Sequence, residues 1–519
     1  MRTNIAVCAT QLALWWQARF SVAHPRKCSR GRVRGALAAV LALVGAGSVA
    51  ASDNDVLGNW LSPPDDNWPL VALHAVLTPD GRILSYGSNN AGANTVQTGF
   101  LIYDVWDPAE GLSGGHLTLD NRTLTDLFCS AQVLLPQSGD VFLAGGDIGT
   151  GKGVKNAGNP NTNLFRSTDN TLFRANDMNR ARWYATTTVL ANGEIYIQGG
   201  RDRNKVGVTA VEVRDANGNF RLLTDIQTGA VDWFYPRNFL APDGRVFGFD
   251  RYGVMYYVTT AGTGSLTMAG NLPSGSRGRE GSAAMFGPGK ILQLSGKSTK
   301  AYVIDINGSI PQVSATQSMS SVRKWMTATI LADGRVLATG GSSVNNELVD
   351  VNNTAAIWDP DTGQWTIGRS GARPRLYHST ALMLPDASVL VAGGGAPGPV
   401  INLHAEIYYP PYLYNSSGDF ASRPNIDSAP ATLNIDDTFS VDVGGTTISR
   451  VTLVKTGAVT HSFNMDQRFL ELSFTQSSGT LFVQTPSNPN IAPPGYYLLF
   501  VFNKRRVPSV GKIVRMNID

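Results

Sequence analysis

The stretch WYATTTVLANGEIYIQGG, residues 183–200, contains two apolar strands that are joined by Asn-Gly and followed by Gly-Gly. Alternating apolar positions around Asn-Gly are typical of a β-hairpin, because Asn-Gly adopts the positive φ angles of a tight turn. Related hairpins recur along the chain, and with this one they make seven. The other six are LHAVLTPDGRILSYGS (73–88), CSAQVLLPQSGDVFLAGG (129–146), FYPRNFLAPDGRVFGFD (234–250), GSAAMFGPGKILQLSG (281–296), WMTATILADGRVLATGG (325–341) and YHSTALMLPDASVLVAGGG (377–395).

This repeat predicts the fold class. A period of roughly 50 residues with four short strands per unit is typical of propeller blades of the kelch type. We therefore predict an all-β chain with a seven-bladed kelch-type β-propeller over residues 53–410. An array of β-sandwiches is the alternative, but it gives no reason for the recurring Gly-Gly. Residues 411–519 keep alternating strands without Gly-Gly, which predicts a C-terminal immunoglobulin-like β-sandwich packed against the propeller.

The first 52 residues have the features of an export leader. The basic run RKCSRGRVRG is followed by the apolar run ALAAVLALVG and by AGSVAAS, whose small residues suit cleavage before Asp53. The apolar run is short for a membrane span, and an uncleaved N-terminal anchor is the alternative. We expect a secreted, periplasmic or cell-surface protein with no membrane span in its mature chain.

Removing the leader changes the charge and the cysteine content. The whole chain has a formal net charge of +4, and the leader holds seven Lys and Arg and no acid, so the mature chain carries −3. Nucleic acid is therefore not an expected partner. Cys8 and Cys28 lie in the leader, so Cys129 stands alone and no disulfide framework remains. We expect a monomer, because a closed propeller leaves few free sheet edges.

Counting back from the first glycine of each Gly-Gly gives a common register. Cys129 lies 16 residues before it and Tyr184 lies 15 before it, while Tyr377 and His378 lie 16 and 15 before it. Equivalent repeat positions lie at equivalent places around a propeller axis, so these side chains should meet at one end of the central channel, where propellers bind ligands. Taken singly, a buried Cys or a packed Tyr is more often structural.

The same register offers further residues for the mouth of the channel. We expect Arg279, Trp325 and Tyr235 to contact substrate, and packing or a place on the rim is the alternative for each. The equivalent positions in blades four, five and six are Phe234/Tyr235, Arg279/Glu280 and Lys324/Trp325.

The chemistry of the gathered side chains favours copper. Two phenol oxygens and an imidazole nitrogen suit tetragonal Cu(II), with one more imidazole needed to complete the set. Zinc would more usually recruit several His, Cys or carboxylates, and calcium prefers carboxylate oxygens.

Four motifs, DLFCSAQ, RARWYATTT, RLYHSTALMLPD and GAVTHSFNMDQR, occur in this order across the propeller and the sandwich. Together they closely resemble the copper radical oxidases, the family of galactose oxidase and glyoxal oxidase. The resemblance runs from about residue 57 to the C-terminus. The RWY sequence, and the absence of an additional carbohydrate-binding domain ahead of the propeller, resemble the glyoxal oxidase branch more than the galactose oxidase branch.

The resemblance implies a complete catalytic centre. It implies one copper ion held by Tyr184, Tyr377, His378 and His461, with His461 supplied by the C-terminal domain. It also implies a thioether cross-link between Cys129 and Tyr184 that stores a radical, while Tyr377 takes the substrate hydroxyl proton. The implied reaction oxidises small aldehydes of the glyoxal type, or primary alcohols of sugars and glycans, and reduces O₂ to H₂O₂.

Two points stay open at the level of sequence. The stacking tryptophan that shields the radical in galactose oxidase has no counterpart that aligns, and Trp183, Trp233 and Trp325 are the candidates. A non-catalytic kelch propeller that binds glycan or protein is the alternative function, because a fold alone does not determine activity. Such a module would have no reason to retain the full ligand set. A third reading keeps the same site but assigns it to modification of a surface polymer, with H₂O₂ incidental.

Overall fold

The computed structural model describes residues 52–64, 67–89, 98–149 and 154–517. The predicted leader, except for Ser52, lies outside the described residues. Within those ranges α1 (Asn54–Leu57) is the only α-helix, beside the short 3₁₀ helices η2 (Pro108–Glu110), η3 (Ser274–Ser276) and η4 (Pro411–Leu413). None of the described helices has the length and apolar character needed to cross a bilayer.

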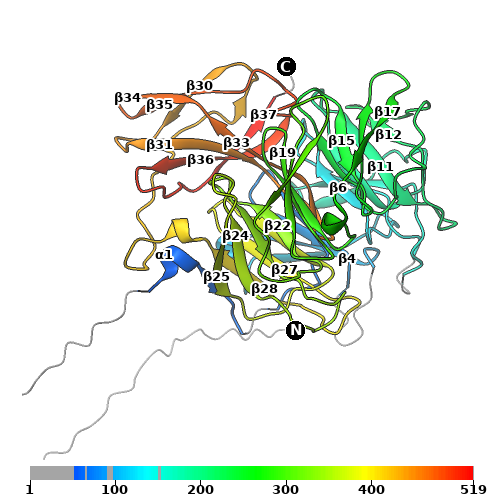
Figure 1. Ribbon diagram of the computed structural model, residues 1–519, viewed down its shortest axis with the longest axis horizontal. Coiled ribbons are helices and arrows are strands. Elements are labelled where there is room, and N and C mark those ends of the chain that lie inside the picture. Colours follow the sequence, from blue (N-terminus) through cyan, green and yellow to red (C-terminus); the bar gives the residue numbers. More distant parts are fainter. Residues whose placement is uncertain (1–51, 65–66, 90–97, 150–153, 518–519) are drawn as a thin grey trace, which may run out of the picture. The chain divides into compact units, whose positions relative to one another are not determined.

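Each of the seven repeat hairpins forms the two inner strands of a four-stranded antiparallel unit, which confirms the predicted propeller (Figure 1). Blades one to three are β2 (His74–Leu77), β3 (Ile83–Tyr86), β4 (Ile102–Trp106) and β5 (His116–Asp120); β6 (Ala131–Leu134), β7 (Val141–Ala144), β8 (Thr162–Arg166) and β9 (Thr171–Arg174); and β10 (Trp183–Val189), β11 (Ile195–Arg201), β12 (Glu212–Arg214) and β13 (Phe220–Leu222). Blades four and five are β14 (Arg237–Leu240), β15 (Val246–Phe249), β16 (Val254–Thr259) and β17 (Ser265–Asn271), then β18 (Ser282–Gly287), β19 (Lys290–Leu294), β20 (Ala301–Asp305) and β21 (Gln312–Thr316).

The last two blades complete the ring, and strands from both ends of the propeller build blade seven. Blade six is β22 (Thr327–Ile330), β23 (Val336–Thr339), β24 (Thr354–Trp358) and β25 (Trp365–Ser370), and blade seven is β26 (Ser379–Met383), β27 (Val389–Gly393), β28 (Ala405–Tyr409) and β1 (Asn59–Leu61). The N-terminal strand β1 runs antiparallel to β28, with Trp60 opposite Tyr408. The segment just after the predicted leader therefore supplies the outermost strand of blade seven, which ties the two ends of the propeller together.

The C-terminal strands form the predicted two-layer sandwich. One sheet has the order β29-β37-β36-β31-β33 and the other the order β30-β35-β34, and a separate apolar core lies between them. The strands are β29 (Thr432–Leu433), β30 (Thr438–Asp442), β31 (Ile448–Lys455), β32 (Ala458–Thr460), β33 (Phe463–Leu472), β34 (Phe474–Ser477), β35 (Thr480–Gln484), β36 (Gly495–Asn503) and β37 (Lys512–Met516).

The hairpin β32–β33 leaves the sandwich and enters the propeller. Strand β32 pairs antiparallel with β2 of blade one, and β33 pairs parallel with β18 of blade five. The hairpin also contacts β6, β10, β14, β22 and β26, so it touches the innermost strand of every blade. This hairpin therefore fills the channel, and the residues at its tip lie among the inner ends of the blades.

The recurring Gly-Gly has a steric cause that the structure makes visible. Gly145 and Gly146, at the end of β7, have φ angles of +73° and +127°. A Cβ atom would lie 2.2 Å from the carbonyl oxygen of Arg182 at Gly145, and 2.1 Å from that of Asp126 at Gly146. Only glycine allows these backbone segments to approach one another this closely.

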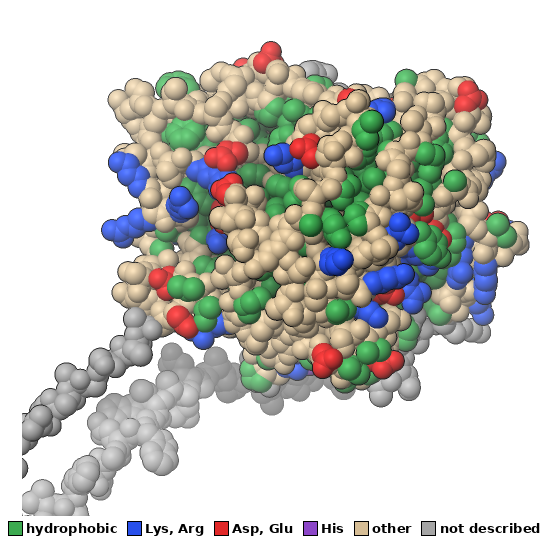
Figure 2. All heavy atoms as spheres, viewed as in Figure 1, with side chains coloured by type: hydrophobic (Ala, Val, Ile, Leu, Met, Phe, Trp, Pro, Cys, Tyr) green, Lys and Arg blue, Asp and Glu red, His purple; other side chains and the backbone are tan. Residues whose placement is uncertain are grey.

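The outer surface carries charges of both signs. On the face in Figure 2, acidic and basic side chains are interspersed among polar and apolar ones, and basic side chains gather toward the lower right of that view. This mixed distribution agrees with the low net charge of residues 53–519.

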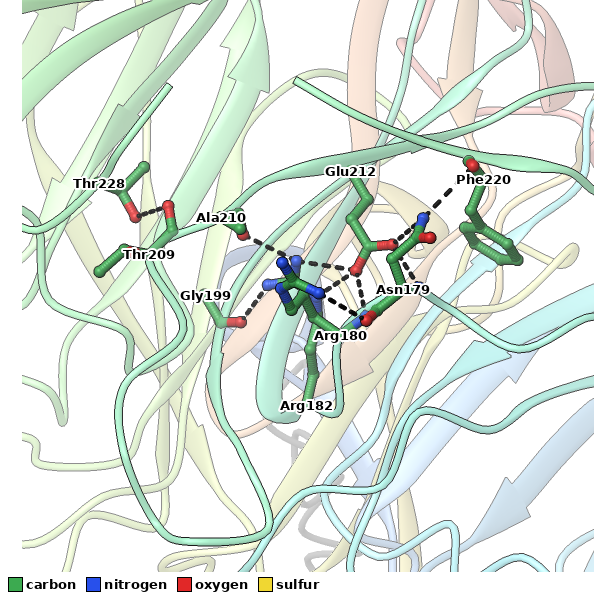
Figure 3. Close-up of polar contacts among 9 residues, drawn as sticks. All are labelled: Asn179, Arg180, Arg182, Gly199, Thr209, Ala210, Glu212, Phe220 and Thr228. Carbon is green, nitrogen blue, oxygen red and sulfur yellow. Dashed lines mark hydrogen bonds and ion pairs between the residues drawn. The ribbon is translucent and has the colours of Figure 1, made fainter. Parts of the chain in front are cut away.

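A buried ion pair holds the segment that leads into Tyr184. The Arg182 guanidinium donates hydrogen bonds to the Gly199 carbonyl at 2.7 Å, to the Ala210 carbonyl at 2.8 Å and to Glu212 at 3.0 Å (Figure 3). Both charged side chains are fully buried. Glu212 in turn accepts the backbone N–H groups of Asn179 and Arg180. The pair therefore fixes the loop before β10 to the third strand of the same blade.

Blade seven repeats this arrangement before His378. Arg375 contacts Glu406 at 2.9 Å and donates to the Gly393 carbonyl at 2.9 Å. Gly199 and Gly393 are both the first glycine of a Gly-Gly, so the two guanidiniums bind the same carbonyl of their repeats, although Arg182 lies 17 residues and Arg375 lies 18 residues before it. A buried Arg–Glu ion pair therefore stabilises both the segment that carries Tyr184 and the segment that carries His378.

Substituting Arg182→Ala leaves the Glu212 carboxylate buried without its counter-charge. We expect the free energy of unfolding to fall by about 3–5 kcal/mol, as measured by urea denaturation. Arg166→Ala is the matched control, because Arg166 and Asp169 form a pair whose side chains are 45% and 48% exposed. That control should change stability by less than about 1 kcal/mol. Equal small losses in both variants would contradict the role given to the buried pair.

Candidate metal centre

Five residues at the inner ends of the blades share a rare backbone conformation. The φ angles are +58° at Cys129, +72° at Tyr184, +36° at Tyr235, +66° at Trp325 and +67° at His378. Positive φ is strained for residues other than glycine, and such strain gathers at functional sites. The shared conformation places these positions in one structural register, in blades two, three, four, six and seven.

The structure also explains why Cys129 lies 16 residues before the first glycine of its Gly-Gly, whereas Tyr184 lies 15 residues before its own. Six residues separate the paired positions Leu134 and Val141 in blade two, whereas five separate Val189 and Ile195 in blade three. The turn of blade two is one residue longer, so Cys129 at position 16 is equivalent to Tyr184 at position 15. The Tyr184 N–H donates to the Cys129 carbonyl at 3.1 Å, which links the two blades directly.

His461 reaches this ring from the tip of the β32–β33 hairpin. The hairpin loop has two residues, His461 and Ser462, with φ angles of +48° and +64°. Two positive φ angles define a type I′ turn, which is normally occupied by Asn-Gly. The strained turn brings His461 beside His378 and Cys129, and the three ligand atoms lie within 4.8 Å of one another.

Hydrogen bonds fix which nitrogen of each imidazole carries the proton. His378 Nδ1 lies 3.0 Å from the Gly395 carbonyl and 2.8 Å from that of Ala396, and since carbonyls only accept, Nδ1 is the donor. Thr460 donates its hydroxyl proton to the Leu73 carbonyl at 3.0 Å. The same hydroxyl oxygen therefore accepts from His461 Nδ1 at 2.6 Å. Each histidine is left with a bare lone pair on Nε2.

These two lone pairs face each other. The Nε2 atoms of His378 and His461 are 3.0 Å apart, and Cys129 Sγ lies 3.4 Å from His461 Nε2. Burial lowers the pKa of His378 to about 3 and holds the pKa of His461 well below its usual value, so both rings are neutral. Two lone pairs at this distance repel unless a cation binds them. The arrangement therefore fits a metal ion, with the Nδ1 contacts orienting the ligands.

Two phenols complete the group. The hydroxyl groups of Tyr184 and Tyr377 form a short hydrogen bond with each other. Burial raises the pKa of Tyr184, of Tyr377 and of the Cys129 thiol, and a hydrogen bond from Tyr184 acts in the opposite direction on Cys129. All the predicted copper and cross-link residues therefore meet at one place.

Phe234 stacks on the Tyr184 ring, and the sequence reasoning missed it. The two ring centroids are 4.7 Å apart with an interplanar angle of 22°. Among the tryptophan candidates, Trp183 meets Tyr184 edge-on at 3.7 Å, and Trp233 lies 6.4 Å away. Trp325 packs on Tyr377 instead, at 4.4 Å. The repeat register could have identified Phe234, because Phe234 lies 16 residues before the position that replaces the first glycine in blade four.

A cavity of about 530 Å³ opens beside the two phenols. Arg279 and Trp325 line this cavity, as expected for residues that contact a substrate. Tyr235 does not line it: the side chain is 1% exposed, and its hydroxyl donates to the Ser130 carbonyl at 3.2 Å. Tyr235 is therefore a buried packing residue next to the site. It does not reach the cavity in which we expected it to contact substrate.

The comparisons with known proteins agree with the fold. Residues 118–285 match the family model described as glyoxal oxidase N-terminus, and residues 423–516 match the galactose oxidase-like early set domain. A galactose oxidase of Gibberella zeae is 29% identical, over 89% of this chain and 71% of that protein. Aldehyde oxidase GLOX of Vitis pseudoreticulata is 26% identical, over 89% of this chain and 98% of that protein. A solved fungal alcohol oxidase of the AA5 family, in complex with copper, has a TM-score of 0.77 at 23% identity, over 89% of this chain and all of that one.

A propeller whose channel holds a buried Cys, two His and two Tyr beside a cavity is the architecture of a metal-dependent oxidoreductase. With these relatives, the chain is a homologue of the copper radical oxidases, the family of galactose oxidase and the glyoxal and aldehyde oxidases.

Asp126 anchors the loop that carries Cys129, and the pKa of its carboxyl group is raised. One carboxylate oxygen accepts the N–H groups of Gly99 at 2.7 Å and Phe128 at 3.0 Å, and the other accepts the Thr98 hydroxyl at 3.0 Å. Burial raises the pKa of Asp126 to about 6. Because the folded-state pKa lies above the unfolded one, ionising Asp126 destabilises the fold as the pH rises.

Substituting Asp126→Asn should remove this pH dependence and keep the contacts. The amide oxygen still accepts the two N–H groups, and the amide nitrogen can donate to the Thr98 hydroxyl oxygen. Relative to wild type, the variant should gain about 2.4 kcal/mol of unfolding free energy as the pH rises from 4 to 7. Urea denaturation across this range measures the difference, and a constant difference would contradict the raised pKa.

Proposed function

We propose that the protein is an exported copper radical oxidase that oxidises primary alcohols or hydrated aldehydes and reduces O₂ to H₂O₂. The observation that carries this proposal is the pair of neutral imidazoles, whose Nε2 lone pairs face each other beside Cys129, Tyr184 and Tyr377. Export rests on the leader-like sequence of residues 1–52.

Four side chains would hold one copper ion: Tyr184, Tyr377, His378 and His461. Their neutral nitrogens and phenol oxygens are the donor set that suits Cu(II). When bound, copper together with an oxidised phenol accepts two electrons from the substrate and passes them to O₂. The Nδ1 contacts of His378 and His461 orient both imidazoles so that their Nε2 atoms are available to the ion.

Cys129 would be joined to the ring of Tyr184. A thioether forms when the thiol and one ring position each lose a hydrogen, and O₂ takes up the two protons and two electrons as H₂O₂. Two observations support the pairing: the Tyr184 N–H donates to the Cys129 carbonyl at 3.1 Å, and Cys129 is a buried cysteine with no disulfide. A sulfur substituent makes the phenol easier to oxidise, and Phe234, stacked on the ring, excludes water from it.

Tyr377 would take the proton of the substrate hydroxyl. It lines the cavity, and its own hydroxyl is hydrogen-bonded to that of Tyr184. Burial in the free protein raises the pKa of Tyr377, so the phenol becomes a usable base only when a cation offsets that penalty. The Trp325 indole packs on the Tyr377 ring and limits its movement.

Two substitutions test the proposed function on the copper-loaded protein. Cys129→Ser should retain one copper per chain, because the four ligands are intact, and should lose peroxide formation. Tyr377→Phe should lower the rate by a factor of about 10²–10⁴, the usual contribution of a general base. Tyr252→Phe is the matched control, since Tyr252 is 53% exposed and is not among the residues that line the cavity.

Peroxide release is measured over a panel of aldehydes, sugars and polyols, and copper content by atomic absorption. Wild-type protein that binds copper and gives no peroxide with any member of the panel would overturn the proposal. Full activity in both Cys129→Ser and Tyr377→Phe would overturn the assigned roles.

A further inference from the structure

The cavity beside the phenols is lined by positive charge. Arg201, Arg251 and Arg279 are among its lining residues, and none of the described residues that line it is Asp or Glu. Two of these arginines form ion pairs with acidic residues that are not among the lining residues. Arg251 contacts Asp232 at 2.9 Å, and Arg279 contacts Glu280 at 2.9 Å. The third arginine therefore determines the net charge that a bound molecule meets.

Arg201 has no carboxylate partner in the part of the chain that the structure describes. Its guanidinium lies 4.5 Å from the ring centroid of Trp183 and 5.1 Å from that of Trp233, and its buried Nε atom has no hydrogen-bond acceptor. Contacts with aromatic faces hold a guanidinium in place without neutralising it or using its N–H donors.

One acidic residue, Asp147, acts on Arg201 electrostatically, but its oxygens are already engaged. They accept four backbone N–H groups, from Ile148, Lys155, Asn156 and Ala157, at 2.6–3.1 Å. Asp147 therefore shapes the loop beside the cavity and offers Arg201 no hydrogen bond. A ligand that carries a carboxylate would supply the missing partner.

The rest of the lining indicates the size and character of such a ligand. The volume of about 530 Å³ suits a molecule as large as a sugar. Indole faces from Trp183, Trp233 and Trp325 and the side-chain amides of Asn345 and Asn346 complete the wall. Flat apolar faces with a few polar groups fix the orientation of a polyhydroxylated chain, and a guanidinium can bind a carboxylate through two parallel hydrogen bonds.

We propose that this cavity selects a sugar acid, with a carboxylate on Arg201 and a primary alcohol directed at Tyr377. This inference rests on the proposed oxidase function and names its substrate class. In the reaction the –CH₂OH group loses two hydrogens and two electrons and becomes an aldehyde, while O₂ gains them and becomes H₂O₂. The carboxylate is unchanged and serves only for binding.

Gluconate and glucitol form a matched pair of probes, because both carry a terminal –CH₂OH and only gluconate is charged. Their binding is measured on copper-free protein by saturation-transfer NMR, so the result does not depend on catalysis. Wild type should bind gluconate at least about tenfold more tightly than glucitol, the value of one hydrogen bond between charged groups. Arg201→Gln should abolish this preference and leave glucitol binding unchanged, and Arg201→Lys should restore part of it.

Arg122→Gln is the control, since the Arg122 side chain is 85% exposed and does not line the cavity. Equal binding of the two probes by wild type, or a preference that survives Arg201→Gln in a variant with unchanged thermal unfolding, would overturn the proposal. The oxidase proposal fails separately: protein that binds gluconate selectively yet forms no peroxide when copper-loaded refutes the activity and keeps the anion site. Protein that forms peroxide from neutral alcohols and shows no preference for gluconate refutes the anion site and keeps the oxidase activity.

Discussion

The pairing of the β32–β33 hairpin with the inner strands of the propeller is the constraint on which the site depends. Its two strands hydrogen-bond to blades one and five, so its position is set by backbone contacts on both sides of the channel. His461 stands at the tip in a strained two-residue turn, which persists because both flanking strands are fixed. The C-terminal domain is therefore part of the candidate active site, and the site forms only when both domains have folded.

The propeller contributes its half of the site through one repeated backbone conformation. Positive φ at Cys129, Tyr184 and His378 directs three different side chains toward the hairpin from equivalent places in three blades. Buried Arg–Glu pairs beneath Tyr184 and His378 hold those segments against the third strand of their blades. The repeat thus supplies a rigid frame, and the chemistry comes from the side chains that the individual repeats place on it.

Much of this organisation could be predicted from the sequence, because hairpins and turns are local. Asn-Gly and Gly-Gly spacing predicted the seven blades, and the shared register placed Cys129, Tyr184 and His378 at one end of the channel. Contacts between distant segments could not be predicted in this way. Phe234 stacks on Tyr184 from the neighbouring blade, β1 pairs with β28 across about 350 residues, and Arg201 lies between indoles of two blades. Tyr235 shares the register yet points beneath the site, because side-chain direction depends on packing.

The proposed oxidase function depends on a covalent bond between Cys129 and Tyr184 in the copper-loaded protein. The most direct measurement is a peptide mass map after exposure of the purified protein to copper and air. We expect the peptide containing Cys129 to be joined to the peptide containing Tyr184, with a mass two hydrogens below their sum. A free Cys129 thiol in protein that has bound copper would contradict it, because the site would then hold the metal without the radical cofactor.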